Sequence, residues 1–294
     1  MSVHFVFHFN QPETMRSEST LDSEESLFLQ GNNGSTVILI HGLTGSPRET
    51  AYLAMFLNRK GYTVICPRLA NHGQPMEIFR KTRWQDMYES VRQAFLLREA
   101  AGDKNIFVSG LSVGALFALL LADEFKGRVR AVSCLSPILF FDGWNAPKWR
   151  FLLSLGYYTP LKYFVFFKEE SPYGIKNEAI REQVHKYYDQ RTVNDMGDVA
   201  KYGYPFYPIA LLYQHHLLIK YLRKKIPHIE APVQIIQARQ DDMSSVKNAQ
   251  FIYDRIRSKI KEIVLLEDSY HVIVADQERE KVAHALHKFF AAIP

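Results

Sequence analysis

Apolar residues in this chain gather in short, nearly continuous runs that recur along most of its length. The runs are rich in Val, Ile and Leu and occupy residues 36–40, 62–66, 105–109, 130–135, 233–238 and 262–266, with a weaker one at 26–30. Runs of this length and composition predict strands that are covered on both faces, as in a parallel sheet.

Segments with helical periodicity separate these runs. They span residues 47–60, 83–101, 115–126, 246–258 and 276–291. Pro47 suits the first turn of a helix, and Gly61 suits the position just after its end. The alternation predicts an α/β fold with a mostly parallel central sheet, flanked by helices and connected by right-handed crossovers.

The alternation breaks between residues 140 and 230. About half of the chain's aromatic residues fall in this stretch, and its readable pattern is helical, as at 209–224. We interpret residues 140–230 as a helical cap, or lid, over the C-terminal edge of the sheet, where open α/β sheets bind ligands. Residues 26–139 and 231–294 then form the core, and residues 1–25 form a polar N-terminal leader.

The composition is that of an ordinary globular protein, with 47% hydrophobic and 23% charged residues and a formal net charge of +5. We find no basic stripe with interleaved aromatic residues, so no nucleic-acid partner is expected. The compact basic cluster Arg223-Lys224-Lys225 reads as a solvated helix end, with contact to a membrane surface as the alternative. No stretch reaches 18 consecutive apolar residues and no signal sequence is evident, so we expect a cytoplasmic protein.

Cysteine and metal chemistry contribute little to the expected function. Cys66 and Cys134 each lie in or at the end of an apolar run, which predicts buried free thiols. No group of His, Cys, Asp and Glu has a metal-ligand spacing, so neither a metal nor another cofactor is expected.

The most informative motif is the pentapeptide Gly110-Leu111-Ser112-Val113-Gly114, which lies between a predicted strand and a predicted helix. In this context the Gly-x-Ser-x-Gly pattern is typical of a nucleophile elbow. The tight turn forces the serine into a strained conformation that exposes its hydroxyl, and the helix N-terminus favours developing negative charge.

A serine nucleophile needs a base, and the base needs an orienting carboxylate. Asp241 and Asp242 follow the run at 233–238, and Asp268 and His271 follow the run at 262–266. The order Ser, Asp, His is the one found on this fold class, and all of these residues leave the same edge of the predicted sheet as Ser112.

Five segments together resemble the α/β-hydrolases, and within them the carboxylesterase and monoacylglycerol lipase group. They are His41-Gly42-Leu43-Thr44-Gly45, Asn71-His72-Gly73, the pentapeptide ending at Gly114, and the stretches 237–242 and 271–277. The resemblance covers about residues 26–292 outside the cap. It implies that Ser112 is the nucleophile, His271 the general base and Asp241 the acid, with Asp242 as the alternative acid or a cap for the helix that starts near Val246.

The resemblance also implies an oxyanion hole formed by the backbone N–H groups of Leu43 and Val113. His41 reads as a structural residue that fixes the oxyanion loop, with a second base as the alternative, and His72 likewise reads as structural. His215 and His216 lie in the cap, where pocket and surface positions stay open. Asp268 reads as a solvated loop carboxylate.

These residues predict a serine hydrolase that cleaves carboxylic esters through an acyl-enzyme intermediate. The aromatic cap favours a small-molecule ester with an apolar acyl group, such as a short- to medium-chain ester or a monoacylglycerol. A thioesterase or lysophospholipase would use the same triad, and a non-catalytic ligand-binding protein on a hydrolase fold is the alternative from another class. The sequence does not set the oligomeric state.

Overall fold

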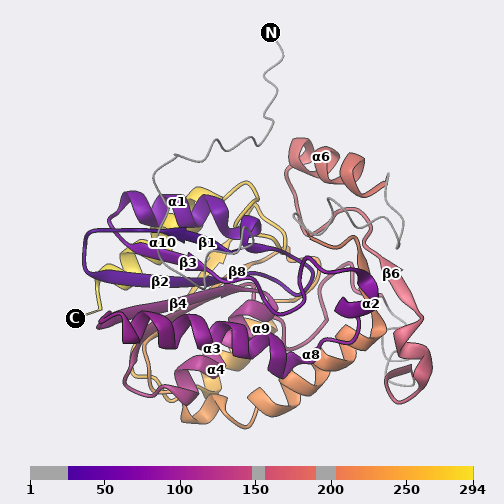
Figure 1. Cartoon of the computed structure of the whole chain (residues 1–294). Coiled ribbons are helices and arrows are strands. Elements are labelled where there is room, and N and C mark those ends of the chain that lie inside the picture. The colour runs from indigo at the N-terminus through magenta and orange to yellow at the C-terminus, as the bar shows by residue number, and fades with distance from the viewer. Residues whose placement is uncertain (1–25, 148–155, 190–202, 294) are drawn as a thin grey trace.

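The computed structural model describes residues 26–147, 156–189 and 203–293 (Figure 1). Its centre is a seven-stranded sheet in the order β1-β3-β2-β4-β5-β8-β9. The strands are β1 (Leu27–Leu29), β2 (Ser35–Ile40), β3 (Thr63–Cys66), β4 (Asn105–Leu111), β5 (Val129–Leu135), β8 (Val233–Ala238) and β9 (Lys261–Leu266). All neighbours pair in parallel except β1, which runs antiparallel to β3 at the edge. The predicted α/β sheet is confirmed.

Helices cover both faces of the sheet (Figure 1). On one face lie α1 (Ala51–Arg59) and α10 (Arg279–Ala291), which contact each other. On the other lie α3 (Trp84–Ala100), α4 (Val113–Glu124) and α9 (Lys247–Arg255). Successive side chains of a strand point to opposite faces, so Val37 and Leu39 pack in one core layer while Ile38 and Ile40 pack in the other.

The predicted helices all form, with ends that differ by a few residues. The first begins as a 3-10 turn, η1 (Pro47–Thr50), before α1, and Gly61 follows its end at φ 90°, a conformation that glycine adopts without strain. A short helix, α2 (Met76–Phe79), was not predicted because four residues are too few to show periodicity. Cys66 and Cys134 are buried free thiols, as expected.

The described part of the cap is not purely helical. It contains α6 (Glu178–Asp189), α8 (Ile209–Leu222), the 3-10 turns η3 (Pro160–Tyr163) and η4 (Ile226–His228), and a two-stranded antiparallel sheet of β6 (Phe166–Lys168) and β7 (Phe206–Pro208). Helices α6 and α8 fit the helical pattern of this stretch, and no pattern in the sequence indicated the β6–β7 pair. Helix α8 extends from the cap beneath the sheet and packs on α3 and α4, whereas α6 lies apart from it (Figure 1).

Two further sequence predictions concern residues at the margins of the fold. The leader, residues 1–25, lies outside the described residues, as do residues 148–155 and 190–202 of the cap. In the basic cluster at the end of α8, Lys225 pairs with Asp123 at 3.2 Å, and the Arg223 guanidinium lies over the ring of Phe140 at 4.7 Å. Within the described ranges, no helix has the length and apolar character needed to cross a membrane.

Candidate active site

Ser112 lies in the turn between β4 and α4, and its backbone has φ 57° and ψ −116°. This region is sparsely populated by residues other than glycine, so the surrounding structure must hold it. Its own N–H donates to the carbonyl of Leu135 at 2.8 Å, which ties the turn to β5. The strained turn that the pentapeptide predicts is present.

The two glycines of the pentapeptide are required by close backbone packing. A Cβ atom at Gly110 would overlap the backbone of Gly114, and a Cβ atom at Gly114 would overlap the carbonyls of Ile40 and His41. Helix α4 can therefore start directly against β2 and β4. The N–H of Val113 is the first of this helix, where the helix itself supplies no acceptor.

The three predicted triad residues meet at the C-terminal edge of the sheet. The Nε2 atom of His271 lies 2.9 Å from the hydroxyl oxygen of Ser112. On the other side of the ring, Nδ1 of His271 lies 2.9 Å and 3.0 Å from the two carboxylate oxygens of Asp241. These are hydrogen-bond distances, so the Nδ1–H tautomer would leave Nε2 free to accept the serine proton.

Other side chains and backbone groups fix the orientation of Asp241. Its Oδ1 accepts the N–H groups of Met243 and Ser244 at 2.8 and 2.7 Å, and its Oδ2 accepts the Gln237 side-chain amide at 2.7 Å. Asp241 is only 3% exposed. These donors satisfy the buried carboxylate oxygens and fix the side chain beside His271.

The two alternative carboxylates occupy different places. Asp242 is also buried, but its Oδ1 accepts the backbone N–H of His271 at 3.2 Å rather than a ring proton. Its reading as a helix cap was wrong, because the turn before α9 is held by Asp142, which accepts the Ser245 N–H at 2.9 Å. Asp268 is exposed and pairs with Lys176 at 2.6 Å.

The charge environment of His271 matters for a general base. Burial lowers its pKa, but the charge and hydrogen bond of Asp241 outweigh burial, with smaller contributions from Asp242 and Glu49, and the pKa is raised above 6.5. Burial raises the pKa of Asp242, opposed by the positive charge of His271.

The loop after β2 places Gly42 and Leu43 next to the serine. A Cβ atom at Gly42 would lie 3.8 Å from the Ser112 Cβ. The Gly42 carbonyl accepts the Nδ1 proton of His41 at 2.8 Å, and the N–H of Leu43 belongs to the same planar trans peptide, so it faces the opposite way. The Nε2 atom of His41 accepts the Leu69 N–H at 3.2 Å, which leaves His41 without a ring nitrogen for Ser112.

His72 and His215 are likewise hydrogen-bonded to backbone carbonyls. His72 donates from Nε2 to the Leu43 carbonyl at 2.7 Å, and His215 donates from Nε2 to the Ile138 carbonyl at 3.0 Å. Burial lowers the pKa of each to about 4, so both stay neutral at pH 7. His216 is exposed on α8.

Glu49 is a site residue that the sequence did not reveal. It lies in η1 and accepts the Gly42 N–H on Oε2 at 2.8 Å, so it holds the loop after β2. Burial raises its pKa, while the Gly42 hydrogen bond and the charge of His271 oppose the rise. In the sequence Glu49 looks like an ordinary acidic residue in the first turn of a helix, where such residues are common.

A second carboxyl approaches the triad from the cap. Glu169 follows β6, and its N–H donates to the Pro205 carbonyl at 2.8 Å. Burial, with the negative charges of Asp242 and Glu49, raises its pKa to about 8, although a hydrogen bond with Tyr207 opposes the rise. Proximity to Glu169 also helps to raise the pKa of Tyr207, after burial. No sequence pattern marked Glu169, because folding alone brings it to His271.

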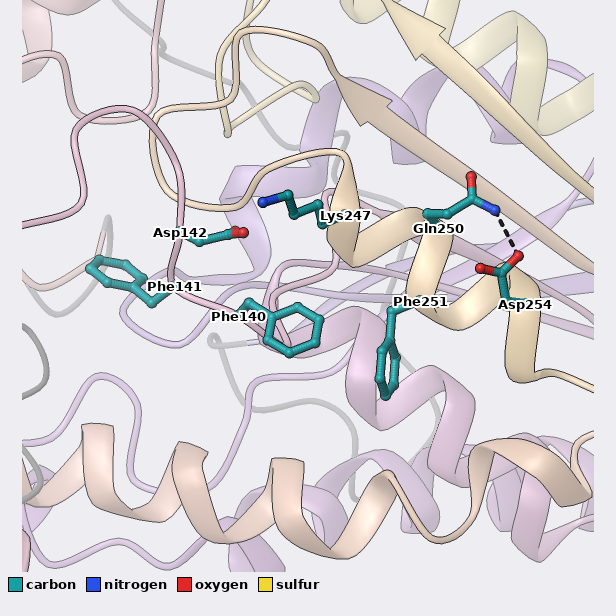
Figure 2. Close-up of a pocket in the computed structure, with 7 residues that line it drawn as sticks. All are labelled: Phe140, Phe141, Asp142, Lys247, Gln250, Phe251 and Asp254. Atoms are coloured by element: carbon teal, nitrogen blue, oxygen red, sulfur yellow. Dashed lines mark hydrogen bonds between the residues drawn. The ribbon is translucent and has the colours of Figure 1, made fainter.

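A separate hollow of about 570 Å³ lies where the loop after β5 meets α9. Figure 2 shows its lining, in which Phe140 and Phe251 provide apolar surface and Gln250 donates to Asp254 at 2.7 Å. None of Ser112, Asp241 and His271 lines it. We therefore place the candidate reaction at the triad and not in this hollow. Within the described ranges, no three His, Cys, Asp or Glu side chains are grouped to hold a metal ion.

A mostly parallel sheet flanked by helices, with a strained serine after one strand and an acid and a histidine after later strands, defines the class of α/β-hydrolases. The profile of the serine aminopeptidase S33 family, a hydrolase family, matches residues 31–278, and the chain belongs to this family.

Relatives of this chain include esterases and lipases. It is 26% identical over 260 residues to a carboxylesterase of Bacillus subtilis strain 168, across 86% of this chain and 91% of that protein. It is 28% identical over 272 residues to a thermostable monoacylglycerol lipase of Bacillus sp. strain H-257, across 90% of this chain and 93% of that protein.

Solved structures of lipolytic enzymes share the fold of this chain. A structure from work on the metagenome-derived lipolytic enzymes LipS and LipT has a TM-score of 0.74 and 25% identity, covering 92% of this chain and 98% of that one. A monoacylglycerol lipase from Paleococcus ferrophilus shares the fold with a TM-score of 0.71 and 18% identity, covering 92% of this chain and 98% of that one. The predicted resemblance to the carboxylesterase and monoacylglycerol lipase group is confirmed, and the chain is an enzyme of the carboxylic ester hydrolase class.

Proposed function

We propose that this enzyme cleaves carboxylic esters with Ser112 as nucleophile, His271 as general base and Asp241 as the orienting acid. The observation that carries the proposal is the continuous hydrogen-bond chain from Ser112 Oγ through His271 to Asp241, with contacts of 2.9 Å on each side of the ring. Such a chain makes an otherwise weak hydroxyl nucleophilic.

In the first half of the reaction, Ser112 Oγ attacks the ester carbonyl carbon while its proton moves to Nε2 of His271. The Asp241 carboxylate stabilises the imidazolium that forms. Collapse of the tetrahedral intermediate breaks the bond to the alcohol oxygen, which takes the proton from Nε2. Water then repeats the sequence on the acyl-enzyme and releases the acid, and no cofactor is needed for either half.

The N–H groups of Leu43 and Val113 are the proposed oxyanion hole. Both flank Ser112, one from the loop after β2 and one from the start of α4. The tetrahedral oxyanion carries a full negative charge that the ground-state carbonyl lacks, so fixed donors stabilise the transition state selectively. Loss of one such donor typically costs about 3 kcal/mol.

We propose short- to medium-chain acyl esters or monoacylglycerols as substrates. The relatives named as carboxylesterase and monoacylglycerol lipase support esters of this class, and the aromatic side chains of the cap favour an apolar acyl group. Tyr157 and Tyr213, for example, pack at 5.6 Å between ring centres and add apolar surface to the cap.

Thioesterase or lysophospholipase activity with the same triad is the second candidate. The described surroundings of the triad disfavour leaving groups that carry phosphates. The negative charges of Asp241 and Asp242 act on His271, so a phosphate near the triad would meet like charges. Neutral alcohols avoid this cost.

A panel of nitrophenyl esters with acyl chains of two to twelve carbons, together with an acyl-CoA and a lysophospholipid, tests the proposal. We expect turnover of the short and medium esters, lost by roughly 10⁴- to 10⁶-fold in Ser112→Ala with an unchanged circular dichroism spectrum. A fluorophosphonate probe should label the native enzyme and not Ser112→Ala. Absence of Ser112-dependent turnover at every chain length would refute the proposal.

A further inference from the structure

The oxyanion loop is held from both sides through its carbonyl groups. The Leu43 carbonyl accepts a hydrogen bond from His72 Nε2 at 2.7 Å. The next carbonyl, that of Thr44, accepts the backbone N–H of Tyr204 at 2.7 Å. Tyr204 belongs to the cap, so the cap bonds directly to the loop that carries one proposed oxyanion donor.

The chain around Tyr204 fits closely against this loop. A Cβ atom at the preceding Gly203 would lie 2.8 Å from the Thr44 carbonyl oxygen, and Gly203 has φ 119°, a value that side-chain-bearing residues rarely adopt. Only a glycine lets the backbone reach Thr44 this closely without strain.

The side chain of Tyr204 fixes the same arrangement a second time. It is fully buried, and its ring stacks on Phe79 with 3.9 Å between centres and 6° between planes. Its hydroxyl donates to the Gln74 carbonyl at 2.6 Å. Phe79 in turn packs edge-on against the His72 ring at 4.8 Å. Tyr204 therefore contacts the loop in two ways. Its N–H binds the Thr44 carbonyl directly, and its ring, through Phe79, supports the histidine that binds the Leu43 carbonyl.

We infer that Tyr204 is a positioning residue for the oxyanion hole. Through this residue, the packing of the cap against the loop after β2 sets the position of the Leu43 N–H. This inference rests on the proposed function. Its consequence is that the cap takes part in stabilising the transition state, beyond providing surface for the substrate. A correctly placed donor stabilises the transition state more than it stabilises the bound ester. Its displacement should therefore lower kcat and leave KM nearly unchanged.

The test compares two variants of Tyr204 with a matched control. Tyr204→Phe removes the hydroxyl and keeps the ring stack, and Tyr204→Leu removes both. The control is Tyr88→Phe, since Tyr88 is also a buried tyrosine, and its hydroxyl donates to Glu124 at 2.6 Å away from the site. All four proteins are assayed with nitrophenyl butyrate and with an alkyl trifluoromethyl ketone, which adds Ser112 Oγ at its carbonyl carbon and places an oxyanion in the hole.

We expect kcat to fall about threefold to tenfold in Tyr204→Phe and about 10- to 100-fold in Tyr204→Leu, with KM within about twofold of the native value. The inhibition constant of the ketone should rise by the same factor as kcat falls. Tyr88→Phe should lower Tm as much as Tyr204→Phe does and leave both constants unchanged.

Two results would overturn the inference. In one, the Tyr204 variants lose Tm like the control but keep native kcat and ketone affinity, so Tyr204 is structural only. In the other, KM rises while kcat stays, so Tyr204 shapes substrate binding. Failure of the proposed function gives a different pattern, because the native enzyme would then not react with the fluorophosphonate probe at all.

Discussion

Asp241 and Asp242 are adjacent in the chain, yet they bind two different parts of His271. Asp241 lies against the ring, with Oδ2 2.9 Å from Nδ1, and Asp242 accepts the backbone N–H at 3.2 Å. The first arrangement can stabilise an imidazolium during the reaction, whereas the second holds the loop in place. The two carboxylates should therefore differ sharply when each is replaced.

Asp241→Asn should lower kcat by about 10⁴-fold, because the amide both removes the charge and permits the wrong imidazole tautomer. Asp242→Asn keeps an acceptor for the His271 N–H and should lower kcat by less than about tenfold. Steady-state kinetics with nitrophenyl butyrate measures both, and near-UV circular dichroism checks the fold. Equal losses in the two variants would contradict the assignment of Asp241.

The pH dependence of kcat/KM should show an acid limb set by His271. A general base must be neutral, and the negative charge of Asp241 raises the pKa of His271 above 6.5 despite burial. Activity should thus fall as pH drops through a midpoint above 6.5, with a slope of one proton. Asp242 also raises this pKa, so Asp242→Asn should move the limb to lower pH. A limb that stays in place or moves upward would show that Asp242 does not act on His271.

Much of the core could be predicted because each of its features is local in the sequence. Continuous apolar runs such as 36–40 must be buried on both faces, and Gly110 and Gly114 flank a serine at the end of a run. The convergence of Ser112, Asp241 and His271 followed from parallel topology, since the C-terminal ends of parallel strands lie at one edge.

The remaining features depend on contacts between distant segments. Strands β6 and β7 have three residues each, and only their pairing makes them a sheet. Glu49 and Glu169 look like ordinary surface acids until folding places them near His271. The choice between Asp241 and Asp242 depends on the turn in which Met243 and Ser244 donate to Asp241.

Two variants should distinguish a glycine that close packing requires from a glycine that only its backbone conformation favours. Gly114→Ala places a methyl group into the Ile40 carbonyl, and we expect it to cost about 3 kcal/mol and to move α4 and Ser112, with loss of activity. Gly102→Ala meets no atom within 4 Å, although its φ of 94° disfavours alanine, and should cost about 1 to 2 kcal/mol with unchanged kcat. Urea unfolding and kcat measure both. Native activity and stability in Gly114→Ala would refute the packing argument.

The Glu169 carboxyl on the cap should make the free energy of unfolding depend on pH. Burial, with the charges of Asp242 and Glu49, raises the pKa of Glu169 from 4.5 to about 8. A carboxyl whose folded-state pKa is raised favours the folded state while it is protonated, and this contribution is lost as pH rises from 4.5 through 8. Glu169→Gln cannot ionise, so relative to the native enzyme its Tm should rise by roughly 2 to 4 °C at pH 9 and change little at pH 5.

Glu170→Gln, at the exposed neighbouring position, is the matched control and should show no such difference between the two pH values. Thermal unfolding followed by circular dichroism gives the four comparisons, and an equal effect of Glu169→Gln at both pH values would show that Glu169 ionises normally.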